Sequence, residues 1–275
     1  MATASANPIV ILDSITHMTA AQRGAVVLAM SHGGHYAAYD AAARGVAAVV
    51  LNDAGIGRER AGLAGGAYLA RLGVPSATVS SQSARIGDGQ DGYASGIVSF
   101  ANEPAVRLGL APGMTARAAL ERFAAAGLPP APQPPPEAEH RIEIAEAGRF
   151  GVKVIVIDSM SLVTPEDVGH IIVSASHGGI LGGKPQTAVK YDASAVVVND
   201  AGFGKDNAGA SRLPALDGRG IAGACVSSFS ARIGDGRSTW EDGYISIVNE
   251  TAARRGGLVG QSCKEFVVAM VATAR

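Results

Sequence analysis

The feature that most constrains this chain is an internal repeat. The stretch Val26–His35 (VVLAMSHGGH) returns later as Ile171–Gly179 (IIVSASHGG), and Ser176 lies 145 positions after Ser31. In each copy an apolar run typical of a buried strand ends in Ser-His-Gly-Gly. A chain of 275 residues is long enough for two homologous units that each bury a core. The sequence therefore predicts a tandem duplication.

Other matching segments have nearly the same spacing. They are IVILDS with VIVIDS, VVLNDAGIG with VVVNDAGFG, SARIGDG with SARIGDG, and DGY with DGY. Aligning the two DGY segments places an insertion, Ser238–Glu241, in the second copy. The proline-rich stretch LPPAPQPPPEAEH predicts a stiff, exposed linker between the copies. We predict a first α/β repeat over residues 1–127, a linker over 128–148 and a second α/β repeat over 149–275.

Apolar β-branched runs alternate with alanine-rich segments in both copies. Such alternation predicts βαβ units and an α/β fold, with mostly parallel sheets and helices on both faces. We expect the two halves to pack about a pseudo-two-fold axis. The polar and glycine-rich turns all follow strands, so right-handed crossovers would gather them at the C-terminal edge of each sheet, where α/β proteins bind ligands. If the two edges face each other, they would enclose a small ligand.

Composition excludes several kinds of partner. The formal net charge is −1, so no basic field is expected to hold nucleic acid or an anionic membrane. No apolar run approaches the roughly 20 residues of a membrane span, and the N-terminus has no secretory-signal pattern. The cysteines Cys225 and Cys263 form no CxxC and predict reduced thiols in a cytoplasmic protein. We expect a small-molecule substrate and a homo-oligomer.

The Ser-His-Gly-Gly turns are the first candidate site. Two glycines after a strand let the backbone aim free N–H groups at a carboxylate, a phosphate or a developing oxyanion. The donors would be the glycines of both turns: Gly33, Gly34, Gly178 and Gly179. His32 and His177 would act as acid or base. The alternative is a tight turn in which the histidine only caps a helix or bonds a neighbouring carbonyl.

Serine chemistry is a second possibility for the same turns. Ser31 and Ser176 are candidate nucleophiles, but adjacent residues in an extended turn point apart, so His32 would seldom reach Ser31. The chain has no G-x-S-x-G elbow, so a base would have to come from another loop or from the other copy.

The Asn-Asp-Ala-Gly turns place an acid after a strand in each copy. Asp53 and Asp200 could orient a histidine, act as general base or bind a cation. Asn52 and Asn199 are candidate substrate-binding residues. The alternative is an Asx-turn that satisfies local backbone N–H groups.

The longest identical block is SARIGDG. Arg85 and Arg232 offer planar forks that suit a substrate carboxylate, and Ser83 and Ser230 are candidate substrate contacts. The alternative is a rigid Arg–Asp clip at a subunit or repeat interface, in which each arginine pairs with the aspartate of its own block.

We expect no cofactor, with a divalent metal such as zinc or manganese as the alternative. Its ligands would come from separate loops of one copy: His32, Asp13, Asp53 and Asp88, or His177, Asp158, Asp200 and Asp235. No HExxH spacing supports that site, and no G-x-G-x-x-G follows either first strand, which disfavours a dinucleotide.

These residues predict a hydrolase of a small polar amide, lactam or ester, with its site at the C-terminal strand edge near the Ser-His-Gly-Gly turns. An alternative is a racemase, isomerase or lyase that takes acid and base from facing halves. A non-catalytic small-molecule-binding or scaffold protein is the third possibility. The copies also differ: His35 stands opposite Ile180, and only the second copy carries Lys184 and Lys190.

Overall fold

A computed structural model describes residues 5–145, 147–149 and 151–274. The chain forms two compact units, each of which includes three residues from the other repeat. Unit 1 comprises Met1–Ile56, Arg60–Glu137 and Gly204–Asp206, and unit 2 comprises Gly57–Glu59, Ala138–Phe203 and Asn207–Arg275. Residues 1–4, 146, 150 and 275, which fall in the ranges predicted from the sequence, lie outside the described part.

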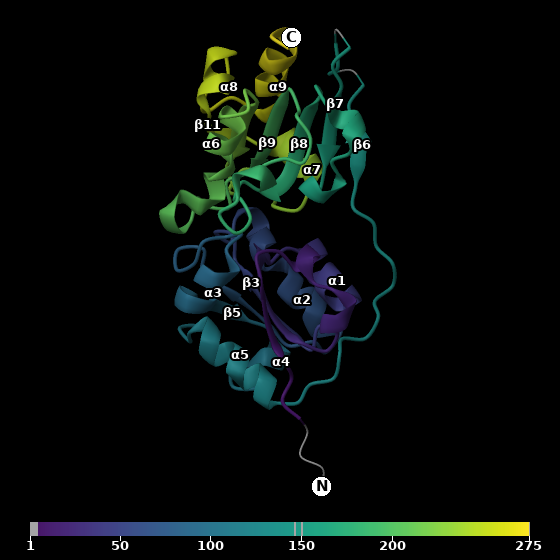
Figure 1. Ribbon diagram of the computed structural model, residues 1–275, viewed down its shortest axis with the longest axis vertical. Coiled ribbons are helices and arrows are strands. Elements are labelled where there is room, and N and C mark those ends of the chain that lie inside the picture. Colours follow the sequence, from purple (N-terminus) through teal and green to yellow (C-terminus); the bar gives the residue numbers. More distant parts are fainter. Residues whose placement is uncertain (1–4, 146, 150, 275) are drawn as a thin grey trace. The chain divides into compact units, whose positions relative to one another are not determined.

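Unit 1 contains a five-stranded sheet in the order β1-β2-β3-β4-β5 (Figure 1). Its strands are β1 (Ile9–Leu12), β2 (Val26–His32), β3 (Ala48–Asn52), β4 (Ser76–Val79) and β5 (Val98–Ala101). Strands β1 to β4 are parallel, and β5 is antiparallel to β4.

Helices cover both faces of this sheet. They are α1 (His35–Ala43), α2 (Ala64–Arg71), α3 (Gly89–Ser95), α4 (Glu103–Arg107) and α5 (Ala116–Ala125). Successive residues of β2 point to opposite faces. Val27 belongs to the core that includes α1 and α2 residues, whereas Leu28 belongs to the core that includes α5 residues. Burial on both faces explains why the strand is apolar from Val26 to Met30.

Unit 2 repeats this plan with one additional strand. Its sheet order is β11-β10-β9-β8-β7-β6. The strands are β6 (Arg141–Glu143), β7 (Val154–Ile157), β8 (Ile171–His177), β9 (Ala195–Asn199), β10 (Ala222–Val226) and β11 (Ile245–Val248). The helices are α6 (Arg212–Asp217), α7 (Gly236–Asp242), α8 (Glu250–Arg254) and α9 (Cys263–Ala272).

The crossover that follows the strand ending in Ser-His, β2 in unit 1 and β8 in unit 2, differs between the units. In unit 1 it is helix α1, whereas the described residues between β8 and β9 of unit 2 form a loop with one short 3-10 turn, η6 (Pro185–Thr187). The other 3-10 turns are η1 (Ile15–His17), η2 (Ala20–Gln22), η3 (Arg58–Leu63), η4 (Met160–Leu162), η5 (Pro165–Asp167) and η7 (Lys205–Ala210).

The α/β class, the duplicated unit and the two mostly parallel sheets with flanking helices are therefore confirmed. The order of the parallel strands is consecutive in both sheets. Neither sheet has the reversal of strand order that opens a ligand crevice in doubly wound proteins. Any ligand site at the strand ends must therefore be shaped by the loops.

The alignment of the two DGY segments is wrong. Helices α3 and α7 both contain seven residues and follow the caps Asp88 and Asp235, which lie 147 positions apart. Asp242 therefore stands opposite Ser95, and no insertion precedes it. The first DGY lies within α3, where a Cβ on Gly92 would meet Met30, whereas the second DGY spans the end of α7, so the two segments are not structurally equivalent.

The segment predicted as a linker contains ordered contacts. Ala131 is buried and its N–H donates to Val46 O (2.7 Å), while residues Arg141–Glu143 form strand β6. Strand β6 pairs antiparallel with β7, and its Arg141 donates two hydrogen bonds to the buried Asp167. A sequence pattern dominated by prolines does not reveal such contacts, since they depend on partners distant in the chain.

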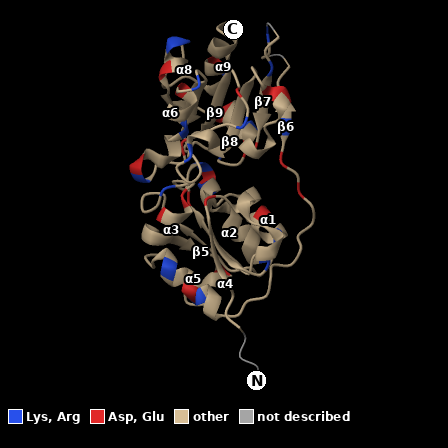
Figure 2. Ribbon diagram, in the orientation of Figure 1, with Lys and Arg blue, Asp and Glu red and all other residues tan. Residues whose placement is uncertain are grey.

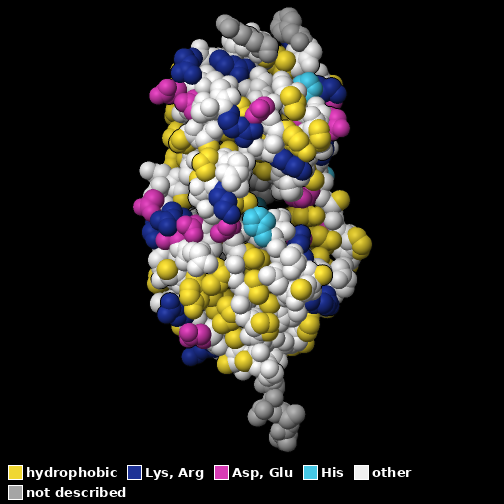
Figure 3. All heavy atoms as spheres, in the orientation of Figure 1, with side chains coloured by type: hydrophobic (Ala, Val, Ile, Leu, Met, Phe, Trp, Pro, Cys, Tyr) yellow, Lys and Arg dark blue, Asp and Glu magenta, His cyan; other side chains and the backbone are white. Residues whose placement is uncertain are grey.

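Charged residues lie on the helices, the loops and β6, and the inner strands of both sheets carry no Lys, Arg, Asp or Glu (Figure 2). On the face drawn in Figure 3, basic and acidic side chains are interspersed. No helix in the described residues is long and apolar enough to cross a membrane.

Candidate functional site

The Ser-His-Gly-Gly turns lie at the C-terminal ends of β2 and β8, as predicted. His32 is paired with Asn52 in the strand register, and His177 is paired with Asn199. The register shifts just before each histidine. This irregularity leaves Met30 O to accept the N–H of Gly87 from the SARIGDG turn (2.9 Å), which ties that turn to the strand end. The turns after β2, β3 and β4 are therefore gathered at one edge of unit 1.

The glycine N–H groups of both turns donate within their own unit. Gly33 N–H donates to Asn52 O (2.7 Å), and Gly34 N–H donates to Nδ1 of His32 (3.2 Å). In unit 2, Gly178 N–H donates to Asn199 O (2.8 Å) and Gly179 N–H donates to Nδ1 of His177 (3.2 Å). The predicted backbone donors are thus already engaged, and an oxyanion would have to find another donor.

The imidazole of His32 supplies such a donor. Because a backbone N–H can only donate, Nδ1 of His32 must accept, and the ring proton lies on Nε2. Burial lowers the pKa of His32 to about 4, so the ring is neutral near pH 7. No residue in the described ranges forms a hydrogen bond with Nε2. This N–H is therefore a fixed neutral donor at the strand edge.

Ser31 and Ser176 hold the preceding loops in place. Ser31 Oγ is buried and accepts the N–H of Ile15 (3.0 Å), and Ser176 Oγ accepts the N–H of Met160 (2.9 Å). Ile15 lies in η1, the 3-10 turn after β1, and Met160 lies in η4, the 3-10 turn after β7, so both contacts anchor the turn that follows the strand next to the serine's own. Because the contact is the same in both units, it favours a structural role for Ser31 and Ser176 over a role as nucleophiles.

The asparagines that end β3 and β9, Asn52 and Asn199, are fully buried and hold neighbouring loops in place. Asn52 donates from Nδ2 to Ala84 O (3.1 Å), and its Oδ1 accepts the N–H of Ala54 (2.9 Å). Asn199 makes the same two contacts, with Ala231 and Ala201. Both asparagines connect the strand end to the SARIGDG segment of their own unit.

The neighbouring aspartates use one oxygen each. Oδ1 of Asp53 accepts the N–H groups of Gly55 (3.0 Å) and Ser81 (2.9 Å), and Oδ1 of Asp200 accepts those of Gly202 and Ser228 (both 2.9 Å). The Asx-turn is therefore present in both copies. Among the residues that the structure describes, none donates to Oδ2 of either aspartate. That oxygen is left for a water molecule or a ligand.

The loops after these aspartates have an unusual backbone that was not predicted from the sequence. Four successive residues, Ala54 to Gly57, have positive φ angles, and so do the matching residues Ala201 to Gly204. Non-glycine residues in this region cost roughly 1–2 kcal/mol each. Glycine at alternate positions of Ala-Gly-Ile-Gly and Ala-Gly-Phe-Gly lowers the conformational cost of these positive φ angles. This glycine spacing is the feature of the sequence that could have indicated them. Both copies therefore retain a strained left-handed loop beside the aspartate.

Each arginine of SARIGDG pairs with the aspartate of its own block, which is the internal pairing expected for the clip. Nε and Nη2 of Arg85 donate to Asp88, and Nε and Nη2 of Arg232 donate to Asp235 (2.9–3.2 Å). The pKa of each arginine is raised, chiefly by hydrogen bonds to Asp206 for Arg85 and to Asp235 for Arg232. Ser83 and Ser230 each donate to a carbonyl three residues earlier (2.8 Å). These four candidate substrate contacts thus have structural partners in the chain.

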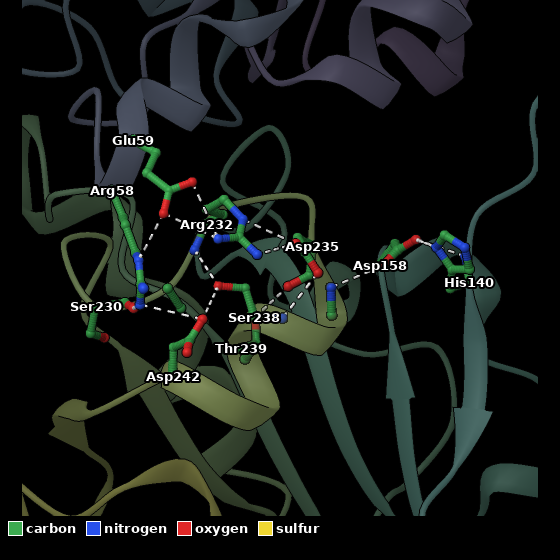
Figure 4. Close-up of polar contacts among 12 residues, drawn as sticks. Arg58, Glu59, His140, Asp158, Ser230, Arg232, Asp235, Ser238, Thr239 and Asp242 are labelled. Atoms are coloured by element: carbon green, nitrogen blue, oxygen red, sulfur yellow. Dashed lines mark hydrogen bonds and ion pairs between the residues drawn. The ribbon is translucent and has the colours of Figure 1, made fainter.

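Two residues that follow the left-handed loop complete the clip in unit 2. Figure 4 shows Arg58 and Glu59 pointing toward the clip. Nη1 of Arg58 donates to Ser230 O (2.7 Å) and lies 3.3 Å from Oδ2 of Asp242, while both oxygens of Glu59 lie 3.3 Å from Nη1 of Arg232.

In unit 1 a cation also contacts an acid of the helix after the SARIGDG turn, but the acid and the serine of that helix occupy each other's positions. Nζ of Lys205 contacts Asp91 (2.6 Å) and Ser95 (3.0 Å), whereas the matching positions of unit 2 are Ser238 and Asp242. Burial alone would raise the pKa of Asp91, but hydrogen bonds from Lys205 and from the Arg85 N–H outweigh burial and lower it. Acid and serine have therefore changed places while the cation contact is kept.

The remaining predictions concern thiols and metals. Cys225 and Cys263 are free and buried, and burial raises the pKa of Cys263 to about 12 and that of Cys225 further. Within the described ranges, no group of three or more His, Cys, Asp or Glu side chains is arranged to hold a metal ion. The zinc or manganese alternative thus gains no support from geometry.

Comparisons with models of protein families, with curated proteins and with solved structures found no match to this chain.

Proposed function

We propose that the chain is an enzyme, a hydrolase of a small polar amide, lactam or ester that acts at the strand edge of unit 1. The proposal depends on one observation: the neutral Nε2–H of His32 lies at the end of β2, and the neighbouring strand β3 leads directly into Asp53. A fixed donor and a carboxylate oxygen without a protein partner are then available at one edge.

In this proposal His32 polarises the substrate carbonyl. The developing oxyanion accepts a hydrogen bond from the Nε2–H of His32. This donor takes the role first expected of the Gly33 and Gly34 N–H groups, which already donate within the protein. A neutral imidazole is suited to this role, because it can donate a hydrogen bond to the oxyanion and still keep its own proton.

Asp53 serves as the general base. Its Oδ1 is fixed by two backbone N–H groups, so Oδ2 is held in one direction and can accept a proton from an attacking water molecule. Water is the proposed nucleophile, since Ser31 Oγ already accepts the N–H of Ile15. No metal or organic cofactor is assigned to the reaction.

A racemase, isomerase or lyase is the second candidate, and it is favoured by the same two residues, His32 and Asp53. A carboxylate that removes a proton next to a carbonyl, together with a neutral imidazole that polarises that carbonyl, performs enolisation without a covalent nucleophile. We further propose a cytoplasmic location, because both cysteines are free thiols, and a homo-oligomeric state.

The test is incubation of the full chain in D₂O with a panel of small amides, lactams, esters and hydroxy or amino acids, followed by NMR. Hydrolysis products support the first candidate, and deuterium gain beside a carbonyl supports the second. For either reaction His32→Gln and Asp53→Asn should lower kcat/KM by about 10²-fold or more.

The matched controls are His177→Gln and Asp200→Asn, which alter the equivalent residues of unit 2. If kcat/KM is unchanged in the His32 variant, His32 has no catalytic role and both candidates fail. Tight binding of a panel member without turnover would indicate a binding protein instead.

A further inference from the structure

The crossover loop of unit 2 carries positive charges that the proposed function does not use. This loop, residues 180–190, replaces helix α1 and contains Lys184 and Lys190, two of the five lysines of the chain, all of which lie in the second copy. No carboxylate in the part of the chain that the structure describes forms an ion pair with either lysine.

A buried arginine lies under the loop. Arg212 is 3% exposed, and its guanidinium donates only to backbone carbonyls, namely those of Thr187 (3.2 Å), Ala188, His177 (3.4 Å) and Gly179 (3.1 Å). Its backbone N–H donates to Gly178 O (2.7 Å). Arg212 therefore fixes the loop to three successive carbonyls of the Ser-His-Gly-Gly turn.

The charge of Arg212 is not neutralised. Carbonyl dipoles stabilise a guanidinium but leave its net charge, and burying a cation without a carboxylate is costly. No ion pair of Arg212 occurs in the described residues, and its buried Nε has no hydrogen-bond partner there. Burial lowers the pKa of Arg212 to about 10, which still leaves it cationic near pH 7.

The loop also presents free backbone donors. Ile180 and Leu181 direct their N–H groups to Ser211 (3.1 Å) and Thr187 (2.9 Å). The N–H groups of Gly182 and Gly183 find no acceptor among the described residues, and both glycines are exposed. Two free donors thus precede Lys184 directly.

We propose that the Gly182-Gly183-Lys184 segment binds a phosphate group of a small molecule, with Arg212 supplying a buried positive charge and Lys190 a peripheral one. Backbone N–H groups and lysine are common phosphate ligands, and several unpaired cations favour a dianion over a singly charged carboxylate. This site goes beyond the proposed function and does not depend on it, because it lies in unit 2 and requires no turnover.

The experiment is an NMR titration of the ¹⁵N-labelled full chain with inorganic phosphate at constant ionic strength, with acetate in a parallel titration. We expect saturable shifts of the Gly182 and Gly183 amides, and no comparable shifts at Gly33 and Gly34 of unit 1. Phosphate should bind at least about fivefold more tightly than acetate.

Variants test whether the positive charges of the loop, and not only its fold, determine the affinity for phosphate. Lys184→Ala, an exposed change, should weaken phosphate binding about fivefold. The control Lys153→Ala removes a lysine that pairs with Glu143 and should leave binding unchanged. Arg212→Lys keeps the charge and should retain most of the affinity, whereas Arg212→Met should lower it about tenfold.

The proposal is overturned if wild-type Gly182 and Gly183 show no saturable shift. Equal shifts with acetate, or equal affinity in the Lys184→Ala chain, would overturn it as well. These outcomes need only the wild-type chain and an exposed variant, so the test does not depend on whether Arg212→Met folds.

Discussion

The two units differ most where α1 of unit 1 gives way to a loop in unit 2. One position explains much of the difference, since Gly65 N–H donates to Gly33 O (2.9 Å) and Arg212 N–H donates to the matching Gly178 O (2.7 Å). A Cβ on Gly65 would lie 2.5 Å from Ala38 Cβ, so glycine there allows α1 to pack closely. Arg212 instead fills the equivalent space with a side chain that satisfies loop carbonyls. The comparison shows that the strand-edge scaffold is kept while the crossover is replaced.

The most severe test of this comparison gives unit 1 the residue of unit 2. Gly65→Arg would force a charged side chain against Ala38 and the Gly34 carbonyl, which a Cβ would approach to 2.7 Å. We expect a loss of about 4 kcal/mol or more in the free energy of unfolding. Urea denaturation checks this, with Gly218→Ala as control because a Cβ there meets nothing closer than 3.6 Å. A well-folded Gly65→Arg chain of wild-type stability would show that packing of α1 does not depend on glycine.

The second test concerns the pH dependence of stability. Because burial lowers the pKa of His32 to about 4, the unfolded chain binds a proton between about pH 6.5 and 4 that the folded chain does not. This contribution is present above pH 6.5 and is lost as the pH falls, amounting to as much as about 3 kcal/mol. Urea unfolding at pH 7 and 4.5 should show a smaller decrease for His32→Gln than for the wild type. Parallel decreases would mean that His32 titrates normally.

The third test asks whether the aspartates are equivalent. Asp53 and Asp200 each accept two backbone N–H groups at nearly the same distances. Replacing either by alanine leaves two donors unpaired and should cost about 2 kcal/mol. The two variants should agree within about 0.5 kcal/mol in urea denaturation. A difference of more than about 1 kcal/mol would show that the equivalent contacts do not contribute equally to stability.

The smallest effect should come from exchanging acid and serine in α3. Asp91→Ser removes the acid that receives Lys205 and should cost about 1 kcal/mol. Adding Ser95→Asp reproduces the order found in unit 2, so the double variant should return to within about 0.5 kcal/mol of the wild type. A double-mutant cycle measures this recovery. Strictly additive losses would show that the order of acid and serine matters.

The sequence predicted the fold well, because its evidence was local and repeated. Apolar runs such as Val26–Met30 and Ala195–Val198 lie in strands, and the alanine-rich segment after His35 is helix α1. The edge strand β6 was missed because three residues that alternate polar and apolar side chains carry little signal within a proline-rich segment. Helix α3 was not predicted because its two glycines, Gly89 and Gly92, resemble turn residues. Helix α7 was not predicted because its seven residues are mostly polar and follow a glycine-rich turn.

The site was predicted less completely. Strand order places His32 and Asp53 at one edge, and that followed from the pattern. The engaged N–H groups of Gly33 and Gly34 could not be foreseen, since their acceptors depend on backbone geometry. The role of Arg212 was also hidden, because a lone arginine before a short helix resembles a surface residue.

The central claim, that His32 is a fixed neutral donor, is tested most directly by long-range ¹H–¹⁵N NMR of the imidazole across a pH titration. The account predicts a proton on Nε2 and none on Nδ1 at pH 7, with the ring staying neutral until the pH falls toward 4. A proton on Nδ1 at pH 7, or a ring that becomes charged above pH 6, would contradict it.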